Sequence, residues 1–176
     1  RLRVFGYEKN RGRGYALRVG FKHARGNTIV TTESDLSWGP DIVEKLLDGL
    51  NTQDCDMVVA SPHGAEGRLE NVPANRVFLS RFGNKILQHA TQSPITMLSG
   101  MTRAYRRRVI DALFLENDGK EIHLEIISQA DALGFQIGEI SATLAWEPPK
   151  QGTPARKSNF SAPRYIYSHI MFTFGQ

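Results

Sequence analysis

The sequence predicts an α/β fold in which a mostly parallel sheet is flanked by helices. Two short runs rich in β-branched and apolar residues, 28–32 and 57–60, have the composition and length of buried strands. The segment before the first run carries an apolar stripe at helical spacing, formed by Leu17, Gly20, Phe21 and Ala24. Because strands that alternate with helices are typical of βαβ units, a mostly parallel sheet is the expected arrangement.

Further helices and strands continue this alternation. Pro40 is at a favoured position for opening a helix, and the apolar residues between it and Leu50 form one packing face. The stretch 61–74, with its Gly and Pro residues, is expected to be a loop. Apolar spacing predicts three more helices and a strand: helices over 75–91, around 109–113 and over 122–133, and an extended strand over 136–146.

Composition limits the class of protein. The chain has 176 residues, enough for one domain, with 40% hydrophobic and 23% charged residues, as in ordinary globular proteins. A net charge of +4 favours anionic partners, but does not choose among phosphates, nucleotides, acidic lipids and nucleic acid. The single cysteine, Cys55, excludes an intramolecular disulfide and indicates a reducing compartment. No apolar run approaches the about 20 residues of a spanning helix.

The first predicted strand ends in two acids. Glu33 and Asp35 are one residue apart, so in extended geometry their side chains point to the same side. Two carboxylates at the carboxyl end of a strand are suited to a divalent cation, which prefers hard oxygen ligands, and ligands of open α/β sheets bind at this edge. The alternative is a solvated acidic turn that leads into the next helix.

Five short motifs follow one another along the chain: Asn10-x-Gly12-Arg13-Gly14, Glu33-Ser34-Asp35-Leu36, Ser99-Gly100-Met101 followed by Arg106-Arg107, Leu124-Glu125-Ile126-Ile127, and Glu139-Ile140. In order and spacing they resemble the motifs of family 2 glycosyltransferases of the GT-A fold, and most of all the dolichyl/polyprenyl-phosphate mannosyl- or glucosyltransferases. The resemblance covers about residues 8–160 and implies a GT-A (Rossmann-like) fold. Residues 1–163 are then the C-terminal part of the catalytic domain and 164–176 an amphipathic C-terminal helix.

The resemblance implies an inverting transfer of a hexose from a nucleotide sugar, of the GDP-mannose or UDP-glucose type, to a polyprenyl or dolichyl phosphate. Mg²⁺ or Mn²⁺ is expected as cofactor, held by Glu33 and Asp35, and Asp35 and Glu125 are the expected catalytic residues. An acceptor that is already a phosphate is largely ionised at neutral pH, so a dedicated general base is not required. The lipid acceptor implies a peripheral location on the cytoplasmic face of a membrane.

Basic and glycine-rich positions are candidates for binding the two substrates. The expected donor-binding residues are Gly12, Arg13, Arg156 and Lys157. The expected acceptor-binding residues are Ser99, Gly100, Arg103 and Arg106, since the arginine fork of donors matches phosphate oxygens. For each of these positions the alternative is a solvated basic loop or helix start. The apolar stripe over 165–174 is a candidate membrane-surface helix, or else packs on the domain's own core.

Several positions depart from the family pattern. Glu33 replaces an Asp, Ser37 stands where Gln is common, and Pro62 follows Ser61 where an Arg is common. The strand that begins the family's domain and binds the base has no counterpart here, so an N-terminal βαβ unit is expected to be missing. These departures favour a second hypothesis, a non-catalytic GT-A module that binds a nucleotide or a partner. A nucleic-acid module built on Arg106–Arg108 lacks interleaved aromatic residues, and no nucleic acid is expected as partner.

Overall fold

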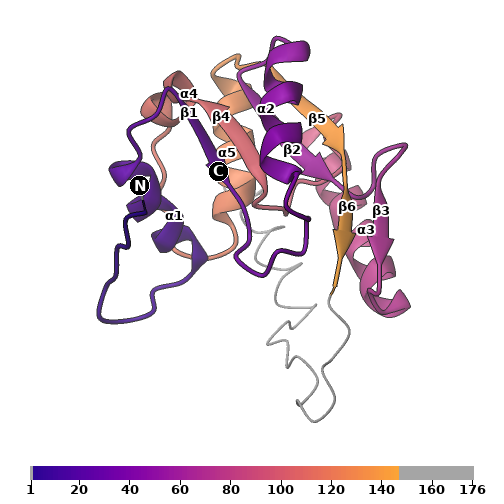
Figure 1. The fold of residues 1–176 in the computed structure, drawn as a ribbon. Helices are drawn as coiled ribbons and strands as arrows, with labels where there is room; N and C mark the ends of the chain where they lie inside the picture. The colour runs from indigo at the N-terminus through magenta and orange to yellow at the C-terminus, as the bar shows by residue number, and fades with distance from the viewer. Residues whose placement is uncertain (1, 147–176) are drawn as a thin grey trace.

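The computed structural model describes residues 2–146. Its first half alternates helices and strands: α1 (Arg13–His23), β1 (Thr28–Thr31), α2 (Ile42–Thr52) and β2 (Met57–Ser61). The second half comprises β3 (Arg68–Glu70), α3 (Ala74–Thr91), β4 (Arg103–Arg106), α4 (Arg107–Ala112), α5 (Ile122–Ala132), β5 (Ile137–Ser141) and β6 (Thr143–Ala145). Figure 1 shows these elements as one α/β unit. The predicted α/β class, with helices flanking a sheet, is confirmed; the main sheet is mixed, because β4 runs against both of its neighbours.

Four strands form the main sheet in the order β1-β4-β2-β5. Strand β4 runs antiparallel to both of its neighbours, whereas β2 and β5 are parallel. The strands β1, β2 and β5 therefore share one direction, and their carboxyl ends lie at the same edge of the sheet. Strands β3 and β6 form a separate parallel pair, and the amide of Ala145 on β6 donates to the carbonyl of Ser37, which ties this pair to the segment after β1.

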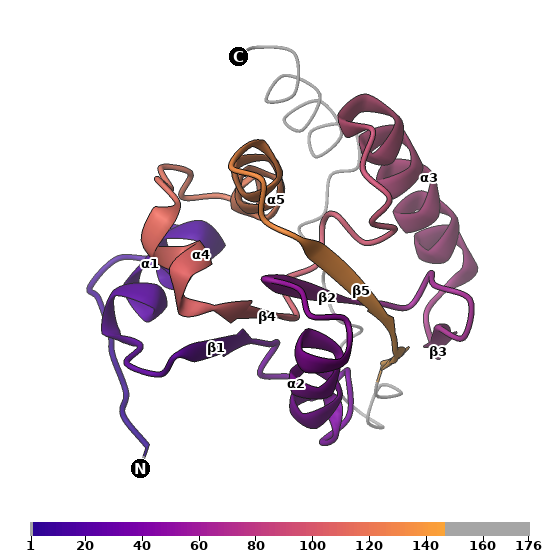
Figure 2. The same ribbon diagram turned by 90° about the horizontal axis from the view of Figure 1, so that it is seen from above.

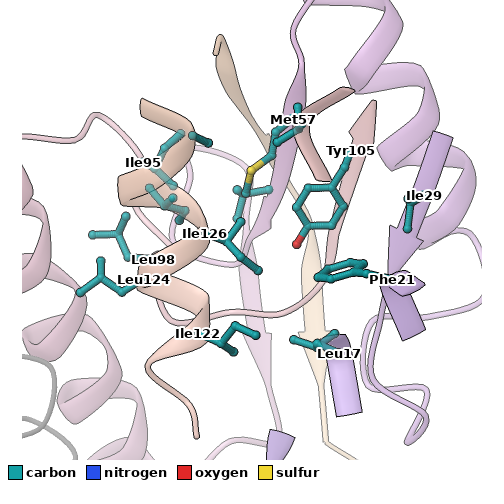
Figure 3. Packing of buried hydrophobic residues seen from close by; sticks show 14 of the residues in the cluster. Leu17, Phe21, Ile29, Met57, Ile95, Leu98, Tyr105, Ile122, Leu124 and Ile126 are labelled. Carbon is teal, nitrogen blue, oxygen red and sulfur yellow. The ribbon is translucent and has the colours of Figure 1, made fainter. Parts of the chain in front are cut away.

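Helices cover both faces of the sheet (Figure 2). Alternate residues of each strand face opposite sides, so neighbouring positions of β2 belong to different cores. Met57 and Val59 join a cluster with residues of α1 and α5, while Val58 and Ala60 join a cluster with α2. In the first cluster the rings of Phe21 and Tyr105 meet edge to face, with centroids 5.7 Å apart (Figure 3).

The second cluster is smaller and lies under α2. Leu46 and Leu50 of this helix are fully buried, in agreement with the predicted packing face. Trp38 belongs to the same cluster and is 5% exposed, so it packs in the core. Cys55 is a small side chain of this core, and its burial raises the pKa of the thiol. Complete burial of a Leu side chain contributes about 1.5–3 kcal/mol, so Leu46 and Leu50 stabilise the packing of α2 on the sheet.

The structure also differs from the expected pattern in three places. The extended stretch 136–146 is divided into β5 and β6, which belong to different sheets. The predicted loop 61–74 contains the short strand β3. Strand β4 was not expected, because its sequence, Arg-Ala-Tyr-Arg, has charged residues at both ends. The predicted C-terminal helix 164–176 lies outside the described residues. Within residues 2–146 no helix is long and apolar enough to cross a membrane.

Candidate active site

The acidic turn follows directly after β1, at the carboxyl edge of the sheet. The Glu33 carboxylate accepts hydrogen bonds from Trp38 Nε1 at 3.2 Å and Ser37 Oγ at 3.4 Å. The amide of Ser37 donates to Asp35 Oδ1 at 3.2 Å. Leu36 adopts a left-handed conformation with φ 57°, which reverses the chain between the two acids and Trp38. Because Trp38 is buried under α2, the half-buried Glu33 carboxylate is anchored to the core.

This turn offers two carboxylates to a cation. Among residues 2–146 no group of three or more His, Cys, Asp or Glu side chains is placed to hold a metal ion. A six-coordinate Mg²⁺ or Mn²⁺ bound by Glu33 and Asp35 would therefore take its other oxygen ligands from a substrate and water, as Mg²⁺ commonly does with phosphates. The donor set of hard oxygens fits such an ion. Ser37 supports the Glu33 carboxylate in this structure through its hydroxyl.

The glycine-rich turn that opens α1 packs against another part of the chain. The backbone of residues 117–119 lies so close to Gly12 and Gly14 that a Cβ atom at either position would overlap it. Gly12 also has φ 105°, which L side chains rarely adopt. The amides of Gly14 and Tyr15 donate to the Asp118 carbonyl at 2.8 and 3.3 Å. In this structure, therefore, the two glycines admit the backbone of a neighbouring loop.

Arg13 projects from this turn and is exposed. Burial and the positive charge of Arg13 lower the pKa of Lys120, so the two cations are near one another. Helices α1 and α5 each lead into a strand of shared direction, so both begin at the carboxyl edge of the sheet. Figure 1 shows these helix starts and the segment after β1 on the lower side of the sheet. The predicted donor-binding residue Arg13 and the acidic turn are therefore at the same edge.

Glu125 is 4% exposed and lies in the first turn of α5. Its carboxylate accepts hydrogen bonds from the amides of Glu116 at 3.0 Å and Asn117 at 3.2 Å. A buried carboxylate is costly without such partners, and these amides explain how an acid is accommodated in an apolar helix. In this structure the Glu125 carboxylate therefore supports the loop that precedes α5, and its expected catalytic role stays a prediction.

The two arginines expected to bind the acceptor lie at opposite ends of β4. Arg103 pairs with Thr31 near the end of β1, whereas Arg106 pairs with Thr28 at its start. The Arg103 side chain is completely buried and donates to the carbonyls of His123 at 2.9 Å and Leu98 at 2.8 Å.

Arg106 donates to the carbonyl of Cys55 at 3.0 Å, at the edge remote from the acidic turn. Both guanidinium groups thus bind backbone carbonyls in this structure; Arg103 is shielded from solvent, whereas Arg106 is partly exposed. The local motif cannot reveal this arrangement, because it depends on the antiparallel strand that contains both residues.

Ser99 borders an apolar cavity of about 190 Å³ between α3 and the β3–β6 pair. Leu69, Val77, Leu87 and Leu144 contribute apolar walls, and Arg76, Ser80 and Asn84 contribute polar groups. Asn84 is buried, and its Oδ1 accepts hydrogen bonds from the amides of Leu98 at 2.9 Å and Ser99 at 3.2 Å. Gly100 is buried beside Ser99. This cavity brings together one of the predicted acceptor residues and a face of α3.

Three residues near the cavity were not singled out from the sequence. Arg76, Ser80 and Asn84 are four residues apart on α3, a spacing that places them on one helix face and was visible in the sequence. The His63 ring, just after β2, is 3.2 Å from Ser80 Oγ through Nε2. Burial and the charge of Arg81 lower the pKa of His63, which keeps its imidazole neutral at pH 7. The predicted donor residues Arg156 and Lys157 lie outside the described residues.

Comparison with known proteins identifies the class first. The fold matches crystal structures of glucosyl-3-phosphoglycerate synthase from Mycobacterium tuberculosis, GT-A glycosyltransferases solved with Mn²⁺ and UDP or UDP-glucose. The TM-scores are 0.62 and 0.63 at 17% identity, covering 93% of this chain and 55% of the other. The family model "Glycosyl transferase family 2" matches residues 1–114, and the chain belongs to this family.

Two curated relatives carry the comparison further. The chain is 30% identical over 105 residues to undecaprenyl-phosphate 4-deoxy-4-formamido-L-arabinose transferase of Sodalis glossinidius, covering 60% of this chain and 30% of the relative. It is 24% identical over 169 residues to dolichol-phosphate mannosyltransferase of Pyrococcus furiosus, covering 94% of this chain and 47% of the relative. The match thus spans 30% of the length of the first relative and 47% of the length of the second.

Proposed function

We propose that this chain carries the catalytic site of a transferase that moves a hexose, with inversion, from a nucleotide sugar to a polyprenyl phosphate. The observation that carries the proposal is the pair of carboxylates, Glu33 and Asp35, fixed by Ser37 and Trp38 at the carboxyl edge of the sheet. The names of the curated relatives support an undecaprenyl- or dolichol-phosphate acceptor. The complexes of the structural neighbours with UDP and Mn²⁺ support a nucleotide-sugar donor and a divalent ion.

On the donor side, Glu33 and Asp35 would hold Mg²⁺ or Mn²⁺ against the donor diphosphate. A divalent ion at such a site neutralises the charge that develops on the leaving nucleotide. Arg13, exposed on its turn at the same edge, would add a positive charge toward the diphosphate, and Lys120 lies near it. Arg156 and Lys157 remain part of the proposal as donor-binding residues. The role of Gly12 is to let the turn pack on residues 117–119.

On the acceptor side, Ser99 at the cavity under α3 is the point at which we place the acceptor. A phosphomonoester is largely ionised at pH 7, because its second pKa is near 6. The acceptor oxygen would therefore attack without a general base, and the side chains would contribute mainly by positioning it. The polar groups of Arg76 and Ser80 on the cavity wall are suited to this task. Engagement of Glu125 by two amides agrees with a reaction that requires no base.

A lipid acceptor requires contact with a membrane surface. Helix α3 carries Phe78 and Phe82, which are 70% and 49% exposed and stack with their ring centroids 6.0 Å apart. Exposed aromatic rings on a helix that also carries Arg76 and Arg81 are the features of a helix at a bilayer interface. We propose that α3 faces the cytoplasmic surface of the membrane and brings the cavity to the acceptor.

The test is a transfer assay in detergent with polyprenyl phosphate and labelled GDP-mannose or UDP-glucose, in the presence of Mn²⁺. Wild-type protein should form labelled lipid, and Asp35→Asn should lower the rate at least about 100-fold, because the ion that would neutralise the leaving nucleotide loses a charged ligand and electrostatic stabilisation of this kind is worth about that much in rate. A folded chain that binds the nucleotide but forms no labelled lipid would replace the proposal with the non-catalytic GT-A module, which the Ser37 and Pro62 departures favour.

A further inference from the structure

A single residue, Asp118, joins the loop before α5 to the turn before α1. Its carboxylate accepts from Arg11 Nη2 at 3.0 Å and forms an ion pair with Arg18. Its backbone carbonyl accepts from the amides of Gly14 and Tyr15. These contacts join residues about 100 positions apart in the sequence, and they use both the side chain and the backbone of Asp118. Asp118 therefore fixes where the turn lies relative to the main body of the domain.

The loop that carries Asp118 is itself held by α5. Glu125 binds the amides of Glu116 and Asn117, as described above. Gln129, one turn further along α5, accepts from the amide of Phe114 at 2.9 Å and donates to its carbonyl at 2.7 Å. A continuous series of hydrogen bonds thus leads from the helix through the loop to the turn. The helix is anchored in the main core by several fully buried side chains, Ile122, Leu124, Ile126 and Ile127.

The turn gains from such a support, because within the described residues its only local side-chain bond runs from the Gly12 amide to Asn10 Oδ1 at 2.9 Å and its glycines allow many backbone conformations. Gly12 and Gly14 flank Arg13, and glycine has the greatest backbone freedom of all residues. The guanidinium of Arg11 also lies over the Tyr15 ring, 4.1 Å from its centroid. Arg11 and Arg18 are bound to Asp118, and Arg13 is exposed between them. Its position follows from the contacts of its neighbours.

We propose that Asp118 is a positioning residue for the donor: it holds the turn 11–14 so that Arg13 meets the nucleotide diphosphate. This inference rests on the proposed function. Because an acid would here favour the binding of an anion, the direction in which the nucleotide affinity changes distinguishes positioning from electrostatics. Asp118→Asn removes one negative charge near the site, so a purely electrostatic effect would tighten nucleotide binding. A positioning effect would weaken it.

The experiment measures the Kd of the nucleotide that wild type prefers, UDP or GDP with Mn²⁺, by calorimetry on the whole chain. The variants are Asp118→Asn, Arg13→Ala and the double variant. Asp111→Asn is the matched control: it makes the same charge change on the exposed surface of α4, where Asp111 pairs with Arg107 at 3.5 Å. We expect Asp118→Asn to raise Kd about tenfold and Arg13→Ala to do the same, with no further loss in the double variant, because two residues that act through one contact are not additive.

Each outcome decides between the possibilities. Unchanged or tighter binding by Asp118→Asn, or losses that multiply in the double variant, would overturn the inference while leaving the proposed function intact. A lower melting temperature with unchanged Kd would reduce Asp118 to a structural role and also overturn it. Absence of nucleotide binding by both wild type and Asp111→Asn would instead refute the proposed function, and the inference with it.

Discussion

Substitution of Arg103 by Met tests whether this arginine supports the fold or binds a ligand. Its guanidinium is completely buried and donates to the carbonyls of Leu98 and His123. Methionine has a similar length but no donor, so the Leu98 carbonyl would lose this partner and the His123 carbonyl would keep its bond within α5. A buried acceptor without a donor costs about 1–3 kcal/mol. Part of this loss is offset, because the variant no longer buries a positive charge. We expect a net loss of about 3 kcal/mol in the free energy of unfolding.

The loss is large against a typical stability of about 5–15 kcal/mol. For a domain of this size it corresponds to a fall of about 6–12 °C in Tm. The assay is urea and thermal unfolding followed by circular dichroism. Arg106→Met is the matched control: this side chain is only partly buried, so water can replace it at the Cys55 carbonyl, and the expected loss is about 1 kcal/mol or less.

One result would refute this reasoning. If Arg103→Met unfolds at the wild-type urea concentration but raises the KM for the acceptor tenfold, Arg103 binds the acceptor, as the sequence motif first suggested. The buried position described here would then not be the one that acts during the reaction.

Two further predictions concern the glycine turn and a histidine. Gly14→Ala should destabilise the chain, because the new Cβ would overlap the Asn117 carbonyl. Gly20→Ala is the control and should not destabilise it, because nothing lies within 4 Å of a Cβ at that position. Urea unfolding of the two variants tests this, and equal midpoints would contradict it. Burial and the charge of Arg81 lower the pKa of His63 in the folded chain below its unfolded value of about 6.5. The neutral His63 ring therefore contributes its full share to the free energy of unfolding above pH 6.5, and this share is lost as the pH falls through the folded pKa. His63→Gln should therefore flatten the stability–pH curve below pH 6.5, and an unchanged slope would show that other groups cause it.

Local patterns predicted the parts of the fold whose causes are local. The β-branched run at 28–32 and the apolar run at 57–60 became β1 and β2, because their residue types favour strands and the second run is buried along its whole length. Gly134 ended α5 in the left-handed conformation with φ 78°, as its residue type predicts. The acids that follow β1 were found in the same way, since their placement depends on the strand that precedes them.

Long-range contacts account for what the sequence did not reveal. Arg103 lies on β4 between β1 and β2, and its guanidinium donates to carbonyls of two other segments. Its burial is therefore a property of tertiary structure alone. Gly12 was expected to bind the donor, but its close neighbour in this structure is a loop more than 100 positions away. Glu125 was expected to be catalytic, and its partners in this structure, two backbone amides, leave no mark in a residue pattern.

The central claim is that Glu33 and Asp35 bind a divalent ion together with a nucleotide. Calorimetric titration of the chain with UDP and GDP, with and without Mn²⁺, tests it most directly. The controls are Asp35→Asn, which removes one proposed ligand, and Asp41→Asn, which makes the same charge change at the nearby acid that pairs with Lys45.

We predict that one nucleotide binds only when Mn²⁺ is present, that Asp35→Asn abolishes this binding, and that Asp41→Asn does not alter it. Nucleotide binding that needs no metal and survives Asp35→Asn, or no binding by a folded wild-type chain, would contradict the account.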